Sequence, residues 1–196
     1  RIVSAAHLLE LGSLVRPGAA ELPATVLYAF ATLPSYRGRG IGKIICNLIL
    51  ERSKNTVQTV CPAEKSLFGY YKTHYGYEPF FRLYEKKISA SGLKMDFSPL
   101  SAPEYGKLRE ILLRGRTHIK YIEKVLKYQH ILCKNSGGDI IAFEGGCAAY
   151  ESEHGIIKFK EFLCTGDTEA EASSIVSALG ADSAVLRAPC TAAQVG

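Results

Sequence analysis

The stretch Tyr36-Arg37-Gly38-Arg39-Gly40-Ile41-Gly42-Lys43 decides how the first half of this chain folds. It follows Ala24–Leu33, whose apolar, aromatic and β-branched residues predict a buried strand that Pro34 ends. It leads into Ile41–Lys54, where apolar residues recur at 41, 44, 45, 48 and 49, the spacing of one helix face. The stretch is therefore a strand-to-helix junction rich in glycine and arginine.

This junction has the chemistry of an anion-binding loop. The first N–H groups of a helix lack intrahelical acceptors and carry a partial positive charge. Glycines let an anion approach the backbone, and Arg39 and Lys43 add fixed positive charge. The order Gly-x-Gly-x-Gly does not fit a dinucleotide-binding Rossmann loop, and no Gly-Lys-Ser/Thr completes a Walker loop. A pyrophosphate is the expected ligand.

Composition is that of an ordinary globular protein. The 196 residues suffice for one large domain or two small ones, and 47% are hydrophobic and 22% charged. No apolar run reaches the roughly 18 residues that a membrane span needs, so we expect no membrane partner. The six cysteines form no C-x-x-C pair, so we expect reduced, buried thiols in a cytoplasmic protein and no metal site. They are Cys46, Cys61, Cys133, Cys147, Cys164 and Cys190.

The net charge of +5 is concentrated in the first half of the chain. Residues 1–92 hold 12 Lys/Arg and 6 Asp/Glu, whereas residues 93–196 hold 12 and 13. A basic half suits an anionic ligand. Nucleic acid is one alternative, but the basic residues do not alternate with aromatic ones along a stacking platform. A phosphate-bearing cofactor fits better, and no nucleic-acid partner is expected.

The remaining patterns predict a repeated α/β arrangement. In chain order they predict a strand at Ile2–Leu11, a strand with turns at Gly12–Pro23, a strand at Thr56–Cys61, a helix at Glu64–Tyr75, a strand at Tyr77–Ile88, a linker at Ser89–Pro103, helices near 103–115 and 121–134, strands within 139–164, a helix at Ala170–Leu179 and a strand at Ser183–Arg187. The order strand, strand, loop, helix, strand of residues 2–61 recurs over 139–190. We therefore predict two domains, residues 1–90 and 91–196.

Two motifs resemble those of a known family. Leu33-Pro34-Ser35-Tyr36-Arg37-Gly38-Arg39-Gly40-Ile41-Gly42 resembles the pyrophosphate loop of the GNAT N-acetyltransferase superfamily, Gln/Arg-x-x-Gly-x-Gly/Ala. Leu67-Phe68-Gly69-Tyr70-Tyr71-Lys72-Thr73-His74-Tyr75-Gly76-Tyr77 resembles its second signature, an aromatic–Tyr pair before Gly-Phe. The resemblance covers residues 1–88 and implies an α/β fold with a mixed, mostly antiparallel sheet flanked by helices. The family's first strand and first two helices have no counterpart here, so we expect them to precede Arg1.

The resemblance also implies a cosubstrate, acetyl-CoA, and a reaction. The family's fourth strand offers backbone groups to the pantetheine arm, a role that falls here on Phe30, Ala31 and Thr32. The implied loop residues are Arg37, Gly38, Arg39, Gly40, Ile41, Gly42 and Lys43. The implied reaction is direct transfer of the acetyl group to a primary amine of a small molecule or peptide.

Acetyl transfer needs a neutral amine, a polarised carbonyl and a protonated leaving thiolate. The family holds the carbonyl with a backbone N–H, which would lie near Thr32, and protonates the sulfur with a tyrosine. Tyr71 is the first candidate and Tyr70 the second. Four residues separate Tyr71 from the next glycine where the family usually has three, so both tyrosines stay open. Glu64, His7 or a water chain are candidates for the base.

The second half resembles the degenerate second unit of tandem GNAT proteins, such as enhanced-intracellular-survival type acetyltransferases. The resemblance rests on element order and on Gly155-Ile156-Ile157-Lys158-Phe159-Lys160-Glu161. It implies a second, smaller GNAT-like α/β unit in which Thr165-Gly166-Asp167-Thr168-Glu169 replaces the phosphate loop. A homo-oligomer is possible. The alternatives to an acyltransferase are a non-catalytic acyl-CoA-binding sensor or scaffold module, and a nucleic-acid-binding protein.

Overall fold

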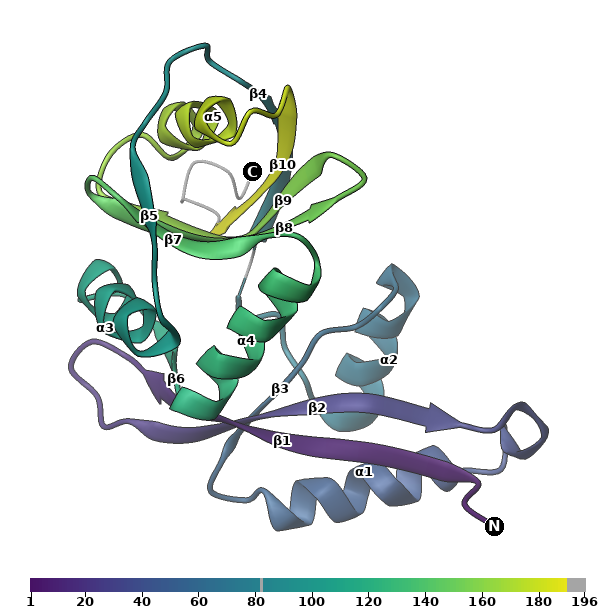
Figure 1. Ribbon diagram of the computed structural model, residues 1–196. Coiled ribbons are helices and arrows are strands. Elements are labelled where there is room, and N and C mark those ends of the chain that lie inside the picture. Colours follow the sequence, from purple (N-terminus) through teal and green to yellow (C-terminus); the bar gives the residue numbers. More distant parts are fainter. Residues whose placement is uncertain (82, 190–196) are drawn as a thin grey trace. The chain divides into compact units, whose positions relative to one another are not determined.

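A computed structural model describes residues 1–81 and 83–189 of the chain (Figure 1). It divides into two compact units. The first unit comprises Arg1–Phe80 with Gly115–Tyr121, and the second comprises Phe81–Arg114 with the chain from Ile122 onward. Elements of the first unit are β1 (Ser4–Val15), β2 (Leu22–Thr32), the 3-10 turn η1 (Pro34–Tyr36), α1 (Ile41–Arg52), β3 (Val57–Val60), α2 (Lys65–Tyr75) and β6 (His118–Tyr121). Elements of the second unit are β4 (Leu83–Ser89), β5 (Phe97–Pro99), α3 (Ala102–Leu112), α4 (Glu123–Asn135), β7 (Asp139–Phe143), β8 (Gly146–Glu153), β9 (Ile156–Cys164), α5 (Thr168–Ala178) and β10 (Ser183–Pro189).

The first unit has a mixed sheet in the order β3-β2-β1-β6. β1 runs antiparallel to both β2 and β6, whereas β3 runs parallel to β2. The sequence predicted a strand ending at Leu11 and a separate strand with turns from Gly12. The structure instead has one continuous β1, because Gly12 takes a φ of 131° at a register irregularity and carries the strand through it.

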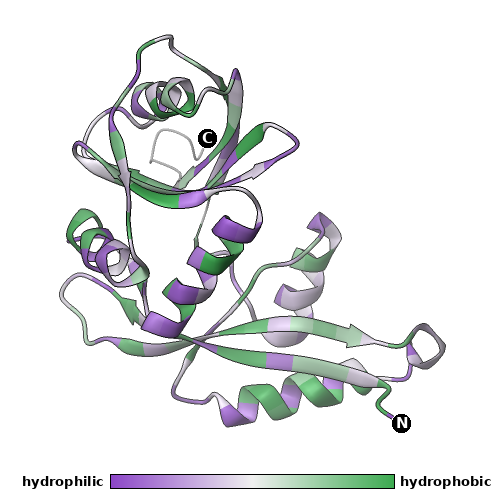
Figure 2. Cartoon of the chain, in the orientation of Figure 1, coloured by the Kyte–Doolittle hydropathy of each residue, from purple (hydrophilic) through white to green (hydrophobic). Residues whose placement is uncertain are grey.

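α1 and α2 pack on the sheet of the first unit through a small core. Its buried members are Leu27, Cys46 and Tyr71. The predicted apolar stripe of α1 is only partly correct, because Ile49 packs against this core whereas Ile44 and Leu48 are 61% and 51% exposed. Figure 2 shows hydrophobic bands along the whole length of α1, and the consecutive apolar residues of its sequence are not confined to one face. Periodicity therefore identifies the helix without selecting its buried face.

The second unit has a six-stranded sheet in the order β4-β10-β9-β8-β7-β5. α5 covers one face, and α3 and α4 lie against the other (Figure 1). β8 and β9 are antiparallel and β10 is parallel to β9, which repeats the arrangement of β1, β2 and β3. β2 and β9 also each have a register irregularity against their antiparallel neighbour. The repeat seen in the sequence thus has a counterpart in strand topology.

Two expectations about the second half need correction. β4 was placed in the first domain by a boundary at residue 90, but it pairs with β10 along Leu83–Ser89 and so belongs to the sheet of the second unit. The second unit is also not the smaller one, since its sheet has six strands against four. The strand pattern of β4 is local, whereas its sheet membership depends on a partner about 100 residues later, which local sequence does not specify.

The structure shows how deeply each described cysteine is buried and how long the helices are. Cys46, Cys133 and Cys147 are buried free thiols, whereas Cys61 is exposed and Cys164 is intermediate, so burial was predicted correctly for only some of them. Cys190 lies outside the described residues. Over the ranges 1–81 and 83–189, no helix combines the length and apolar character needed to cross a membrane.

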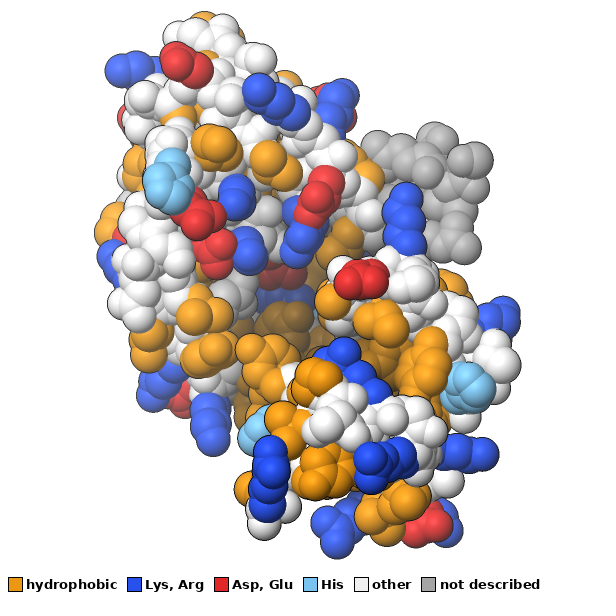
Figure 3. All heavy atoms as spheres, turned by 90° about the vertical axis from the view of Figure 1, so that its right-hand side faces the viewer, with side chains coloured by type: hydrophobic (Ala, Val, Ile, Leu, Met, Phe, Trp, Pro, Cys, Tyr) orange, Lys and Arg blue, Asp and Glu red, His pale blue; other side chains and the backbone are white. Residues whose placement is uncertain are grey.

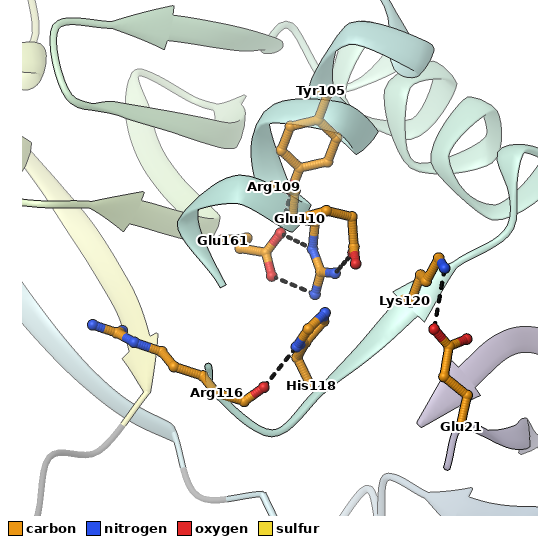
Figure 4. Close-up of polar contacts among 8 residues, drawn as sticks. All are labelled: Glu21, Tyr105, Arg109, Glu110, Arg116, His118, Lys120 and Glu161. Carbon is orange, nitrogen blue, oxygen red and sulfur yellow. Dashed lines mark hydrogen bonds and ion pairs between the residues drawn. The ribbon is translucent and has the colours of Figure 1, made fainter. Parts of the chain in front are cut away.

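A buried ion pair ties α3 to β9 in the second unit (Figure 4). The Arg109 Nε atom lies 2.8 Å from one Glu161 carboxylate oxygen, and its Nη2 atom lies 3.1 Å from the other. The Tyr105 hydroxyl also donates to Glu161, and Tyr105 itself is fully buried. Because the Arg109 side chain is only 5% exposed, this bidentate contact neutralises a charge that water does not reach well.

We expect Glu161→Gln to destabilise the second unit by about 3 kcal/mol, because it replaces the bidentate carboxylate partner of the buried Arg109 with a neutral amide, while the Glu110 carboxylate 3.5 Å away remains. Urea unfolding measures this change. Glu153→Gln is the matched control, since Glu153 pairs with Lys158 at 2.9 Å but both side chains are well exposed. The control is expected to change the free energy of unfolding by less than about 1 kcal/mol. Equal effects of the two substitutions would contradict the assignment.

Candidate functional site

An open pocket of about 600 Å³ lies within the first unit. Its walls are the end of β2, the loop that follows, the first turn of α1 and one face of α2. The lining residues are Phe30, Ala31, Thr32, Tyr36, Arg37, Gly38, Gly40, Ile41, Gly42, Lys43, Leu67, Tyr70, Tyr71, His74 and Tyr75. Every residue expected from the sequence to bind the cofactor or donate the proton lines this pocket except Arg39.

The glycine loop is shaped by two left-handed residues. Gly38 and Gly40 both have a φ of 75°, a conformation that side chains with a Cβ rarely adopt. Gly40 is the N-cap of α1, and the first turn of this helix contains no acidic residue. The N–H groups of that turn therefore have no internal carboxylate to satisfy them. The Arg37 Nε atom donates to the Thr32 carbonyl at 3.1 Å, which ties the loop to the end of β2.

β2 parts from β3 where the pocket opens. The two strands pair in parallel from Ala24 to Leu27, and among the described residues no strand pairs with that edge of β2 farther on. In the same region the register against β1 shifts, because β2 has one extra residue between Tyr28 and Ala31, and Ala29 takes a φ of 50°. Such a bulge takes backbone groups out of the ladder and makes them available to a ligand.

α2 presents a stripe of side chains to the pocket. Leu67, Tyr70, Tyr71, His74 and Tyr75 recur at the spacing of one helix face. Sequence analysis placed the first three on this face and did not include His74 and Tyr75. Extending the same periodicity by one turn would have found both. The His74 ring centroid lies 4.9 Å from that of Tyr70, so the imidazole is part of this aromatic wall.

The two candidate tyrosines differ in environment. Tyr71 is 8% exposed, with its ring packed edge-on against Tyr70 and Tyr77, and burial raises the pKa of its hydroxyl above the ordinary value. That hydroxyl makes no hydrogen bond to any described residue. Tyr70 is 37% exposed, and its hydroxyl lies 3.0 Å from that of Tyr75, which in turn bonds the Cys46 thiol. The Tyr70 hydroxyl is engaged, whereas the Tyr71 hydroxyl is available to a ligand.

Unpaired cations gather at the loop. Within the described part of the chain, Arg37, Arg39 and Lys43 have no acidic partner, and no Asp or Glu lines the pocket. Elsewhere in the first unit, Lys72 pairs with Glu78 at 3.0 Å and Lys120 pairs with Glu21 at 3.2 Å. Figure 3, which views the molecule from the side of this loop, shows Lys and Arg side chains around apolar ones with few acidic side chains among them. This surface suits an anionic ligand with an apolar portion.

The two base candidates from the sequence do not line the pocket. Glu64 is the N-cap residue of α2 and accepts a hydrogen bond from the Ser66 hydroxyl at 3.3 Å. His7 is an exposed residue of β1 opposite Tyr28. His74, in contrast, does line the pocket.

The equivalent helix of the second unit begins differently. The Asp167 carboxylate caps α5 by accepting from the Ala170 N–H at 2.8 Å, and Glu169 and Glu171 lie in the first turn. A Cβ atom at Gly166 would meet the Glu171 carboxylate, so that carboxylate fills the space beside the loop. The N-terminus of α5 is thus already neutralised by its own side chains. Among the described residues, no cluster of His, Cys, Asp and Glu has the arrangement of a metal site.

Comparison with known proteins gives structural matches only. No protein-family model matches the sequence, and no curated protein matches it. A GCN5-related N-acetyltransferase from Kribbella flavida superposes with a TM-score of 0.68 at 18% identity, over 98% of this chain and 51% of that one. A probable N-acyltransferase of unknown function from Enterococcus faecalis V583 gives 0.67 at 16% identity, over 97% and 53%. Eis1 from Mycobacterium abscessus gives 0.63 at 12% identity, over 96% and 53%.

These matches define the class of fold. The chain has the mixed α/β fold of GCN5-related N-acetyltransferases, with two mostly antiparallel sheets. It spans about half the length of the solved structures that it matches.

Proposed function

We propose that this chain is an N-acetyltransferase that binds acetyl-CoA in the pocket of the first unit and transfers the acetyl group to a primary amine. One observation carries the proposal. A single pocket joins the unneutralised N-terminus of α1, the open edge of β2 and the free hydroxyl of Tyr71. A fold shared with acetyltransferases supports the same reaction class.

The cofactor would lie along the pocket in the order of its own parts. The pyrophosphate would accept hydrogen bonds from the N–H groups at the start of α1, with Lys43 adding charge. The pantetheine arm would run along the edge of β2 at Phe30, Ala31 and Thr32. The thioester carbonyl would then accept a hydrogen bond from a backbone N–H of the bulge at Ala29 and Phe30. This position lies two to three residues before Thr32, near which the sequence had placed that N–H.

The reaction exchanges a C–S bond for a C–N bond. The neutral amine attacks the thioester carbonyl carbon, and the collapse of the adduct expels the coenzyme A thiolate. Tyr71 would donate its proton to that sulfur, since its raised pKa keeps the phenol protonated at neutral pH. The proton lost by the amine would pass to His74 or to water and then to solvent. A non-catalytic acyl-CoA-binding module would bind the cofactor in the same way but would turn over no amine in a broad acceptor panel.

The second unit would then be a degenerate copy of the first. It shares the strand topology, but carboxylates occupy the helix N-terminus where the first unit leaves room for phosphate. It would serve to shape the acceptor site or to mediate association.

Loss of the loop should abolish cofactor binding. Gly40→Glu places a Cβ atom and a carboxylate at the N-cap of α1, so we expect acetyl-CoA affinity to fall by about 100-fold or more in calorimetry, because the added charge repels the phosphates. Gly18→Glu is the matched control, since Gly18 also has a positive φ, 72°, in the turn after β1 at the other end of the hairpin. Unchanged affinity in the Gly40 variant, or equal loss in both, would refute the loop assignment.

The donor role of Tyr71 is tested by removing its hydroxyl alone. Tyr71→Phe should lower kcat by about 100-fold with little change in acetyl-CoA affinity, because the ring still packs and only the proton donor is lost. Tyr70→Phe, measured in parallel, should have the smaller effect, since its hydroxyl is bonded to Tyr75. If only the Tyr70 variant is slow, the donor is Tyr70. If neither is slow, the tyrosine mechanism fails and this face of α2 is structural.

If the second unit is degenerate, only the first unit should bind acetyl-CoA. Calorimetric titration of the whole chain should give one acetyl-CoA per chain, because Asp167, Glu169 and Glu171 repel phosphate at α5. Two molecules per chain would show that the second unit retains a site.

A further inference from the structure

We propose that Arg39 binds the 3′-phosphate of coenzyme A, so that the pocket selects the free, 3′-phosphorylated coenzyme as its acyl donor. The inference rests on the proposed function, because it concerns the same site. One basic residue of the loop, Arg39, does not line the pocket. Arg39 is the only expected cofactor residue outside the lining, and it has no acidic partner among the described residues.

Arg39 lies at the tip of the loop. Its neighbours Gly38 and Gly40 both have a φ of 75°, and a Cβ atom added to either would meet no atom within 4 Å. The chain therefore turns sharply on both sides of Arg39 in open space. Arg39 is exposed there and does not line the pocket, so it lies beside the wall of the site and is not part of it.

An aromatic ring holds the guanidinium beside that wall. The Cζ atom of Arg39 lies 5.1 Å from the ring centroid of Tyr36, a cation–π contact. The backbone of Tyr36 is held by the hydrogen bond from its N–H to the Leu33 carbonyl at 2.9 Å, and its side chain lines the pocket. The charge of Arg39 is thus preorganised at the edge of the cofactor pocket, which reduces the ordering that binding requires.

The other basic residues of the loop line the site expected for the pyrophosphate, so Arg39 is the one that can bind an additional phosphate. The pyrophosphate is expected at the helix N-terminus, where Arg37 and Lys43 line the pocket, whereas Arg39 lies outside that lining. A phosphate monoester carries about −1.5 to −2 charge at pH 7 and offers three acceptor oxygens. The planar fork of arginine binds two such oxygens at once, which an ammonium does not do.

This arrangement points to a class of donor. Free coenzyme A has a phosphate monoester on its ribose in addition to the pyrophosphate. A pantetheine arm attached to a carrier protein has no ribose phosphate, and dephospho-coenzyme A lacks only that group. Arg39 therefore favours free acyl-coenzyme A over both of these donors.

The test compares two ligands that differ in one phosphate. Calorimetry at one ionic strength measures coenzyme A and 3′-dephospho-coenzyme A against the wild type, Arg39→Gln, Tyr36→Phe and Arg16→Gln. The wild type should prefer coenzyme A by about tenfold, equivalent to about 1.4 kcal/mol. Arg39→Gln should remove most of this preference by weakening coenzyme A alone. Tyr36→Phe keeps the ring and should retain the preference. Arg16→Gln removes an exposed charge in the turn after β1 and should behave like the wild type.

The outcomes separate this inference from the proposed function. If the wild type binds neither ligand, the proposed function fails and the inference fails with it. If the wild type binds both ligands equally, or if Arg39→Gln weakens both by the same factor, the inference is wrong while the proposed function stands. Retained preference in Arg39→Gln also overturns it. The thermal midpoint of each variant verifies folding, which Arg39 should not affect because it is exposed.

Discussion

The separation of β2 from β3 after Leu27 is the constraint on which the first unit depends. A parallel pair that continued to Thr32 would use the edge of β2 for hydrogen bonds, and α1 and α2 would have no gap between them for a ligand. The bulge at Ala29 and Phe30 accompanies this separation and takes backbone groups out of the ladder with β1. The Arg37 contact to the Thr32 carbonyl then fixes where the glycine loop leaves the strand. The position of the pocket therefore depends on where β2 stops pairing with β3.

The two units have one strand topology but differ in charge at the start of the equivalent helix. Both have an antiparallel pair, a third strand parallel to the second, and a helix between them. What differs is the charge at the start of that helix. α1 begins at Gly40 with no acid in its first turn, whereas α5 is capped by Asp167 and has Glu169 and Glu171 beside it. The carboxylates at the start of α5 stabilise that helix and satisfy N–H groups of the kind that α1 leaves without an acidic partner.

The aromatic wall of α2 combines packing with chemistry. Tyr71 belongs to the core with Leu27 and Cys46, so its ring position is determined by the same contacts that hold the helix on the sheet. Its hydroxyl has no partner among the described residues, so the ring can be rigid while the polar atom stays available. Tyr70 and Tyr75 instead satisfy each other at 3.0 Å. A hydroxyl whose ring is held by packing alone keeps its orientation without using its own hydrogen bond.

The sequence missed the short strands β5 and β6 and divided β1 in two. By itself it determined the glycine loop, the strand before it, the helix after it and most of the other helices and strands. These are local features, because left-handed glycines, helix periodicity and strand composition act over a few residues. Tertiary structure decided what depends on distant partners. It placed β4 beside β10, turned Ile44 and Leu48 of the apolar α1 outward, brought His74 into the pocket and left Glu64 and His7 outside it. Local patterns do not encode sheet neighbours or helix rotation, since both are set by packing between segments far apart in the chain.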